Sequence, residues 1–151
     1  MKQRTLLLSL SVFLILFFGY TPTASAQQVD LVVIGTPDTV PKEMNSQQLR
    51  SVLKGERLRW DNNVSVKIAL MKTNTDIGSA TSERIFNMSS NELNKYFLAM
   101  VFQGKVKAPM FFTSESELES YVARTPGAIG VLSSTTNQSL PIVMVDQNEI
   151  L

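Results

Sequence analysis

The sequence contains neither cysteine nor histidine among its 151 residues. Without cysteine the fold cannot be held together by disulfide bonds, and a lipid anchor on a cysteine after the leader is excluded. Without either residue the usual zinc ligands are missing, and so is the commonest general base of enzymes. We therefore expect no metal and no cofactor, and a fold that depends on its hydrophobic core alone.

An excess of charge of either sign is also lacking, since 14 basic and 13 acidic side chains give a formal net charge of +1. Lys2 and Arg4 lie in the N-terminal leader, so the remainder of the chain is close to neutral. Such a balance gives no electrostatic footprint for nucleic acid or for an acidic membrane surface. We therefore expect neither of them as a partner.

The first residues have the composition of a secretory signal peptide. Lys2 and Arg4 form a basic start, residues 6–20 form an apolar run, and the sequence ASA ending at Ala26 is a small-x-small cleavage site. The run is short for a membrane-spanning helix, which needs about 20 apolar residues. We place the signal peptide at residues 1–26 and a single domain at residues 27–151, in the periplasm or outside the cell, with no membrane anchor.

Hydrophobic patterns divide the remaining chain into strands that alternate with helices. Apolar runs predict strands, and apolar residues at helical spacing behind a capping residue predict helices. The predicted strands are residues 31–34, 64–70, 110–112, 128–132 and 142–145. The predicted helices begin near Asn45, Thr81, Ser89 and Ser114, the last two with capping boxes at residues 89–92 and 114–117. This alternation indicates an α/β fold, a three-layer, mostly parallel sheet with helices on both faces.

The apolar positions also predict the core. We expect three helices to bury the residues Leu49, Val52 and Leu53; Leu93, Tyr96, Phe97, Met100 and Val101; and Leu118, Tyr121 and Val122. Ile85 and Phe86 are expected to point inward at the end of the helix that begins near Thr81. Trp60, the single tryptophan, is interpreted as a lid over the edge of the core.

Residues 68–86 carry most of the chemistry, as an apolar strand, a polar turn and a helix that opens with GSAT. A helix start leaves backbone N–H groups without partners, and small hydroxyl residues there let an anion approach. One interpretation is an oxyanion site for phosphate or a similar anion. Its candidate residues are Lys72, Gly78, Ser79, Ala80 and Thr81. The other is that Ser79 or Thr81 only caps the helix, which is the commoner use of such residues.

Residues 49–60 (LRSVLKGERLRW) and 125–131 (TPGAIGV) resemble the IFxGxxxxW and tpGAIGYv segments of periplasmic phosphate-binding proteins, the receptors of phosphate ABC transporters. Between them, residues 72–86 correspond to an arginine, a Ser-Gly-Thr turn and a helix that reaches a phenylalanine. Residues 32–34 resemble the strand that enters the second lobe of these receptors. The resemblance implies the fold of one lobe of a type 2 periplasmic binding protein.

The chain departs from that family in length and at the anion site. Family receptors are about twice as long and close two lobes around the anion, whereas this chain has residues for one lobe. The phosphate-contacting arginine corresponds to Lys72, which cannot fork two hydrogen bonds onto one oxyanion. Ala80 replaces the central glycine and removes its backbone freedom. For one open lobe we expect binding of about millimolar strength.

Two functions of different class follow. The first is an exported solute-binding module of phosphate-receptor type, in which Lys72, Ser79 and Thr81 contact the anion and the amides of Ala80 and Thr81 assist. The second is a ligand-free interaction module that keeps the fold and acts through an envelope protein or a second copy of the chain.

Catalysis is the least favoured function. Ser79 and Lys72 are seven residues apart across a turn, and nothing supplies a base and an orienting group together. Asp76 and Glu83 are interpreted as a turn residue and a first-turn helix charge, not as a catalytic pair. We therefore predict that the chain is not an enzyme.

Overall fold

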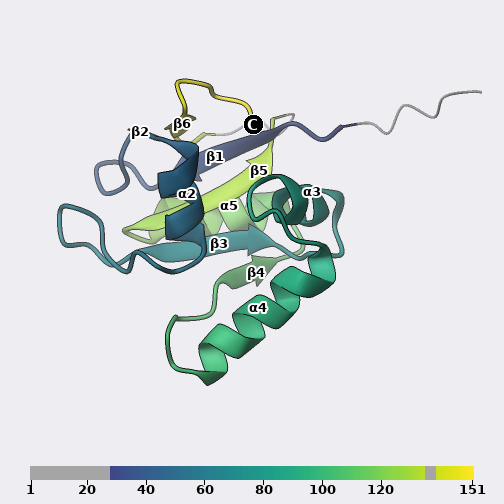
Figure 1. Ribbon diagram of the computed structural model, residues 1–151. Helices are drawn as coiled ribbons and strands as arrows, with labels where there is room; N and C mark the ends of the chain where they lie inside the picture. The colour runs from purple at the N-terminus through teal and green to yellow at the C-terminus, as the bar shows by residue number, and fades with distance from the viewer. Residues whose placement is uncertain (1–27, 135–138) are drawn as a thin grey trace, which may run out of the picture.

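The computed structural model describes residues 28–134 and 139–151 (Figure 1). The predicted signal peptide lies outside the described residues, as does the middle of the polar loop that follows the strand near residue 130. The elements in chain order are β1 (Leu31–Gly35), β2 (Glu43–Met44), α2 (Ser46–Leu53), β3 (Lys67–Met71), α3 (Asp76–Arg84), α4 (Ser90–Phe102), β4 (Met110–Phe112), α5 (Glu115–Arg124), β5 (Ala128–Ser133) and β6 (Met144–Val145).

A four-stranded sheet in the order β1-β5-β3-β4 forms the centre of the molecule. β3 runs parallel to both β5 and β4, whereas β1 runs antiparallel to β5, with Leu31 opposite Ser133. β2 and β6 form a separate parallel pair beside this sheet. The prediction of a mostly parallel sheet is confirmed, and the antiparallel direction of β1 is a feature that it did not include.

Helices cover both faces of the sheet. On one face, residues of α2 and α4 such as Leu49 and Phe97 pack with Phe86 against side chains of β1, β3 and β5. On the other face, Leu118 and Val122 of α5 pack against the alternate side chains of the same strands. In Figure 1, α5 lies behind the sheet, and α2 and α3 lie in front of it. The predicted three-layer architecture is confirmed.

Local sequence explains the best-predicted elements. The five residues of β1 are all buried, because Leu31 and Val33 face one cluster of the core and Val32 and Ile34 face the other. A buried side chain of this size contributes about 1.5–3 kcal/mol. Helix α2 begins behind Asn45, whose side chain accepts a hydrogen bond from the Gln48 amide at 2.8 Å, in a capping box.

Trp60 lies in the core, with 3% of its surface exposed. Its indole N–H donates to the carbonyl oxygen of Gly127 at 2.9 Å, next to the start of β5. Trp60 is thus a structural residue of the core.

Several predicted details are wrong. β3 begins at Lys67 and not at residue 64, and Ala69 on its predicted wet face is fully buried, because α5 covers that face. Ser114 makes no capping hydrogen bond, since its hydroxyl lies 2.8 Å from that of Ser116. Val101 was expected in the core and is 41% exposed, and the last strand contains only Met144–Val145.

Candidate functional site

The carboxyl ends of the parallel strands meet at one edge of the sheet. β3 ends there at Met71, β4 at Phe112 and β5 at Ser133, and the antiparallel β1 begins beside them at Leu31. Helix α3 follows β3 and α5 follows β4, so both helices begin near this edge. Open α/β sheets bind ligands outside the carboxyl ends of their strands, which makes this edge the place to examine.

Helix α3 begins at Asp76, earlier than predicted. Thr75 is the N-cap, and its side-chain oxygen accepts a hydrogen bond from the Gly78 amide at 3.1 Å. The same hydroxyl donates to the carbonyl oxygen of Lys72 at 2.8 Å. The helix start and the cap assigned to Ser79 or Thr81 were therefore wrong. A threonine followed by an acidic first turn is itself a start signal, and Thr75-Asp76 carries it.

The five predicted site residues differ in their settings. Ser79 and Ala80 lie on the outward face of α3, but the Ser79 amide already donates to the carbonyl oxygen of Thr75 at 2.8 Å. Ala80 and Thr81 lie inside the helix, where amides bond to carbonyls four residues earlier. Thr81 is 3% exposed, and its hydroxyl has no partner within the described residues. Lys72 is exposed at the end of β3.

Gly78 has a structural role. A Cβ at this position would lie 2.0 Å from the carbonyl oxygen of Lys72 and 2.9 Å from that of Met71. No side chain fits between α3 and the strand end at such distances. The glycine therefore allows the helix to pack directly on the backbone of the preceding turn.

Helix α4 covers the other side of that turn. The hydroxyl of Ser90 donates to the carbonyl oxygen of Thr73 at 3.0 Å. The amide group of Asn94 donates to the Thr73 hydroxyl at 3.0 Å. These bonds engage polar groups of the turn that would otherwise be available to a ligand.

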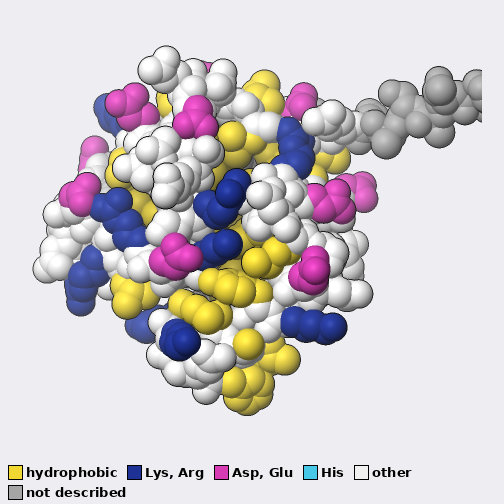
Figure 2. All heavy atoms as spheres, viewed as in Figure 1, with side chains coloured by type: hydrophobic (Ala, Val, Ile, Leu, Met, Phe, Trp, Pro, Cys, Tyr) yellow, Lys and Arg dark blue, Asp and Glu magenta, His cyan; other side chains and the backbone are white. Residues whose placement is uncertain are grey.

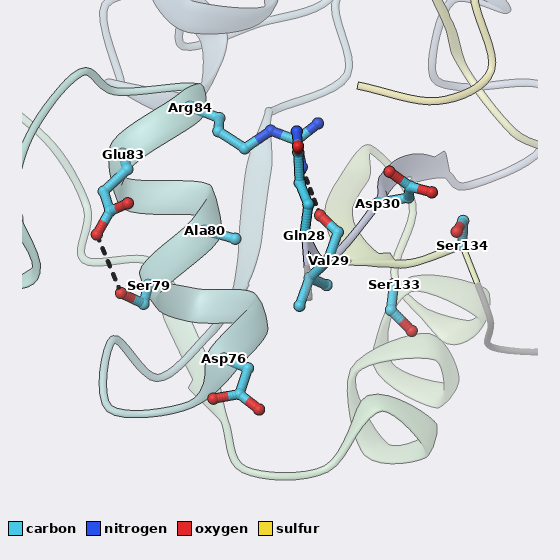
Figure 3. A pocket seen from close by; sticks show the side chains of 10 residues that line it. All are labelled: Gln28, Val29, Asp30, Asp76, Ser79, Ala80, Glu83, Arg84, Ser133 and Ser134. Carbon is cyan, nitrogen blue, oxygen red and sulfur yellow. Dashed lines mark hydrogen bonds between the residues drawn. The ribbon is translucent and has the colours of Figure 1, made fainter. Parts of the chain in front are cut away.

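A hollow of about 760 Å³ lies beside α3 at this edge (Figure 3). Its walls are residues 28–30 ahead of β1, the outward face of α3, and Ser133 and Ser134 at the end of β5. Figure 3 shows the hydroxyl of Ser79 bonded to Glu83, and Arg84 reaching across to the carbonyl oxygen of Val29. Of the predicted site residues, Ser79 and Ala80 line this hollow.

The hollow is acidic. Three carboxylates line it, those of Asp30, Asp76 and Glu83, against the single guanidinium of Arg84. Asp76 lies in the first turn of α3, where its negative charge compensates the positive end of the helix dipole. Asp76, and not Glu83, is thus the first-turn charge, because Glu83 lies in the last turn of the helix.

A further carboxylate accepts hydrogen bonds at the end of β5. Glu115, in the first turn of α5, accepts hydrogen bonds from the amide of Ser133 at 2.9 Å and from its hydroxyl at 3.3 Å. The amide and hydroxyl of Ser133, which an incoming oxyanion would use as donors, are thus bonded to the protein itself.

Among the described residues, no group of three carboxylates could hold a metal ion. In the same part of the chain, no helix is long and apolar enough to cross a membrane.

Sequence reasoning missed Asp30, Arg84 and Ser133 as neighbours in one hollow. They come from three segments that are distant in the chain, so spacing gave no signal for them. Asp76, the acidic residue that follows Thr75, was the one sequence signal that could have indicated where α3 begins.

No family model matches the sequence, and no curated protein matches it. Several solved structures are similar in fold, and three of them are described here. An ABC-type phosphate transport receptor from Vibrio cholerae has a TM-score of 0.63 and 12% identity, over 87% of this chain and 56% of the receptor. A putative phosphate ABC transporter substrate-binding protein with bound phosphate from Clostridium perfringens has a TM-score of 0.59 and 14% identity, over 80% and 47%. PstS from Borrelia burgdorferi has a TM-score of 0.59 and 17% identity, over 80% and 49%.

This chain has the fold of one part of these receptors. It spans about half the length of each one that it matches. The predicted likeness to one lobe of a phosphate-receptor-type binding protein is therefore confirmed at the level of the fold. Two of these neighbours are described as a phosphate transport receptor and as a transporter substrate-binding protein, and not as enzymes, in agreement with the prediction for this chain.

Proposed function

We propose that the chain is an exported, receptor-type binding lobe that acts through a protein partner instead of enclosing an oxyanion by itself. The observation that carries this proposal is the charge at the carboxyl edge. Asp30, Asp76 and Glu83 line the hollow there. The two helix starts at this edge carry acidic residues of the chain in their first turns.

Electrostatics disfavours a multiply charged anion in this hollow. Two like charges about 4 Å apart repel by about 4 kcal/mol at the effective dielectric constant of a protein surface. A free helix start offers an anion only about 0.3–1 kcal/mol in an exposed setting. A single carboxylate near the bound anion therefore outweighs the attraction of the helix, and three carboxylates do so by more.

The size of the chain supports the same function. Receptors reach micromolar affinity, about −8 kcal/mol, when a ligand is buried between walls. This chain matches about half the length of its structural neighbours, so the described lobe supplies one wall, and tight binding requires a second. An envelope protein or a second copy of the chain would provide that wall.

Weak oxyanion binding is the second candidate function, favoured by the fold neighbour that is described with bound phosphate. In this chain, exposed Lys72 and the hydroxyl of Ser79 would make the contacts near Gly78, Ala80 and Thr81. Lys72 has no ion pair within residues 28–134 and 139–151.

Calorimetric titration of residues 27–151 with phosphate tests both functions. We expect no heat of binding at millimolar phosphate for the wild type. Asp76→Asn should bind phosphate measurably, since it removes a negative charge from the first turn of α3. Glu43→Gln, which removes an equal charge on β2, is the matched control and should remain without binding.

Micromolar phosphate binding by the wild type would overturn the proposed function. If Lys72→Ala and Ser79→Ala then each weakened binding, the predicted oxyanion site would be correct. Sedimentation of the same protein over a range of concentrations would detect a second copy as the partner.

A further inference from the structure

The amino-terminal edge of the sheet carries a second hollow, of about 560 Å³. One wall consists of residues 57–59 and 65–68, which lead into β3. The other wall is the loop of residues 104–108 with Met110 at the start of β4, and Tyr121 of α5 closes one side. We call this hollow the basic groove. It lies where β3 begins, whereas the acidic hollow lies where β3 ends.

Five cationic side chains and no carboxylate line the basic groove. The cations are Arg57, Arg59, Lys67, Lys105 and Lys107. The expectation that the chain offers no electrostatic footprint for nucleic acid or for an acidic membrane surface rested on its net charge. The fold instead collects basic residues at one end of the sheet and acidic residues at the other.

Most of these cations lack a counter-charge. Within the described parts of the chain the single ion pair joins Arg57 to Asp61, whose side chain is 90% exposed. Lys67, Lys105 and Lys107 make no side-chain hydrogen bond or ion pair to the residues that the structure describes. Unpaired like charges around one hollow repel each other, and an anionic partner would relieve that repulsion.

The groove is apolar between its charges. Leu58 and Met110 line it and are 60% and 49% exposed. Next to its second wall, α4 ends in Phe102, which is 83% exposed. Figure 2 shows basic and hydrophobic side chains together over the lower part of this face, where α4 and the loop after it lie. Leu58 and Met110 thus give the groove exposed apolar surface that a bound partner would cover.

We infer that the basic groove binds an extended segment of a partner protein in which acidic side chains alternate with apolar ones. Successive side chains of an extended chain point in opposite directions, so such a segment can place carboxylates on both walls and apolar groups between them. A flat bilayer cannot enter a hollow between two walls, and a small anion would leave Leu58 and Met110 uncovered. Charge complementarity and concavity together favour a polypeptide.

One part of the groove is preorganised. The guanidinium of Arg57 lies 5.8 Å from the ring centroid of Trp60, and its Nε donates to the carbonyl oxygen of Arg59 at 3.1 Å. A side chain already fixed in this way loses less conformational entropy when it binds. Trp60 is the only tryptophan of the chain, so its fluorescence reports on this end of the sheet.

The inference deepens the proposed function, because it names the surface and the chemistry of the protein partner. The probe is a short, terminally blocked peptide in which glutamate alternates with leucine, and the control peptide has glutamine in place of glutamate. We expect the glutamate peptide to change Trp60 fluorescence with saturation, and its affinity to fall as salt is raised. The glutamine peptide should bind at least about tenfold more weakly.

Lys105→Glu with Lys107→Glu is the test variant, since both residues are exposed in a loop. Its matched control is Lys42→Glu with Lys95→Glu, which makes the same change in net charge outside the groove. The test variant should bind the glutamate peptide at least about tenfold more weakly, and the control should stay within about twofold of the wild type. Circular dichroism of both variants should match that of the wild type.

The inference is overturned if the glutamate peptide does not bind, if the glutamine peptide binds equally well, or if the test variant keeps wild-type affinity. Phosphatidylglycerol vesicles that bind where the peptide fails would make the groove a membrane contact and also overturn it. Phosphate tests the proposed function separately, at the other end of β3. Micromolar phosphate binding by the wild type without peptide binding overturns both proposals, whereas absence of both kinds of binding overturns only the groove.

Discussion

Thr81 shows how a residue that suggests ligand chemistry in the sequence can be a defect of the core. Its hydroxyl is buried and has no partner in the described part of the chain, whereas the neighbouring Ser82 donates to the carbonyl oxygen of Gly78 at 2.8 Å. A buried polar group without a hydrogen bond costs about 1–3 kcal/mol. Only the fold determines which of two adjacent hydroxyls is bonded, so the sequence could not distinguish them.

Thr81→Val should therefore stabilise the protein. The substitution keeps the shape of the side chain and removes the unpaired hydroxyl, so we expect the free energy of unfolding to rise by about 1 kcal/mol. Urea denaturation measures this change. Ser82→Ala is the control and should lower the free energy of unfolding, since it removes a hydroxyl that is bonded. A destabilised Thr81→Val would mean that the Thr81 hydroxyl has a partner in solution.

Gly78→Ala should lower the free energy of unfolding, which is opposite to the usual effect of this substitution in a helix. Replacing glycine by alanine inside a helix normally stabilises it by about 1 kcal/mol. Here the new Cβ would lie 2.0 Å from the carbonyl oxygen of Lys72, so α3 would have to move away from β3. We expect a loss of more than about 3 kcal/mol in urea denaturation. Ser79→Ala, one residue further on the outward face, should change stability by less than about 0.5 kcal/mol.

At the scale of elements, the sequence predicted the helices that bury apolar side chains. α2 and α4 each combine a capping residue, a partner three positions later and buried residues at helical spacing. The buried residues of α3 are Gly78, Thr81 and Ser82, which give no hydrophobic period to detect. Hydroxyl residues throughout residues 73–82 also offered several caps, and tertiary packing selected Thr75. The predicted oxyanion site depended on where this helix begins. The sequence analysis placed that beginning at residues 78–81, whereas α3 begins at Asp76.

The start of α4 should make stability depend on pH. The amide and hydroxyl of Ser89 both donate to the carboxylate of Glu92, at 2.8 Å each, and thereby lower the pKa of Glu92 below its ordinary value. A lowered pKa in the folded state means that this stabilisation is present above the ordinary carboxyl pKa, about 4.3, and is lost as the pH falls through the lowered value.

Glu92→Gln should therefore lower the Tm at pH 7 and lower it less at about pH 3, where the wild-type carboxylate is losing its charge. Thermal unfolding followed by circular dichroism measures both differences. Glu117→Gln is a matched control, because Glu117 lies in the first turn of α5, where Ser114 makes no capping bond. A Tm difference for Glu92→Gln that is equal at both pH values would contradict the assigned capping bond.

At the scale of the whole molecule, the order of apolar patterns predicted the class of fold, but nothing in the sequence predicted the distribution of charge. Alternating strands and helices were enough for a three-layer sheet, because each apolar pattern had to be covered. The direction of β1 depends on a pairing with β5, nearly 100 residues later in the chain, which no local pattern encodes. The basic groove likewise draws Arg57, Lys67 and Lys105 from separate segments, so a near-neutral sequence conceals it.

Export of the chain is the last prediction, and it concerns the molecule as a whole. The contacts at the beginning of the fold start at Val29, whose carbonyl oxygen accepts a hydrogen bond from Arg84. Leu31 and Leu151 then exchange backbone hydrogen bonds. Cleavage after Ala26 would leave all of these contacts in place. We therefore expect the full sequence, expressed in a Gram-negative host, to yield a periplasmic protein whose intact mass corresponds to residues 27–151.

Replacing both Ala24 and Ala26 by leucine should block this cleavage, because signal peptidase requires small residues at these positions. The unprocessed protein should then remain bound to the membrane through its apolar leader. Ser25→Leu is the control, since the middle position of a small-x-small site tolerates a large side chain, and it should be processed like the wild type. Recovery of the wild type from the cytoplasm at full mass would contradict export, and would also exclude a partner in the envelope.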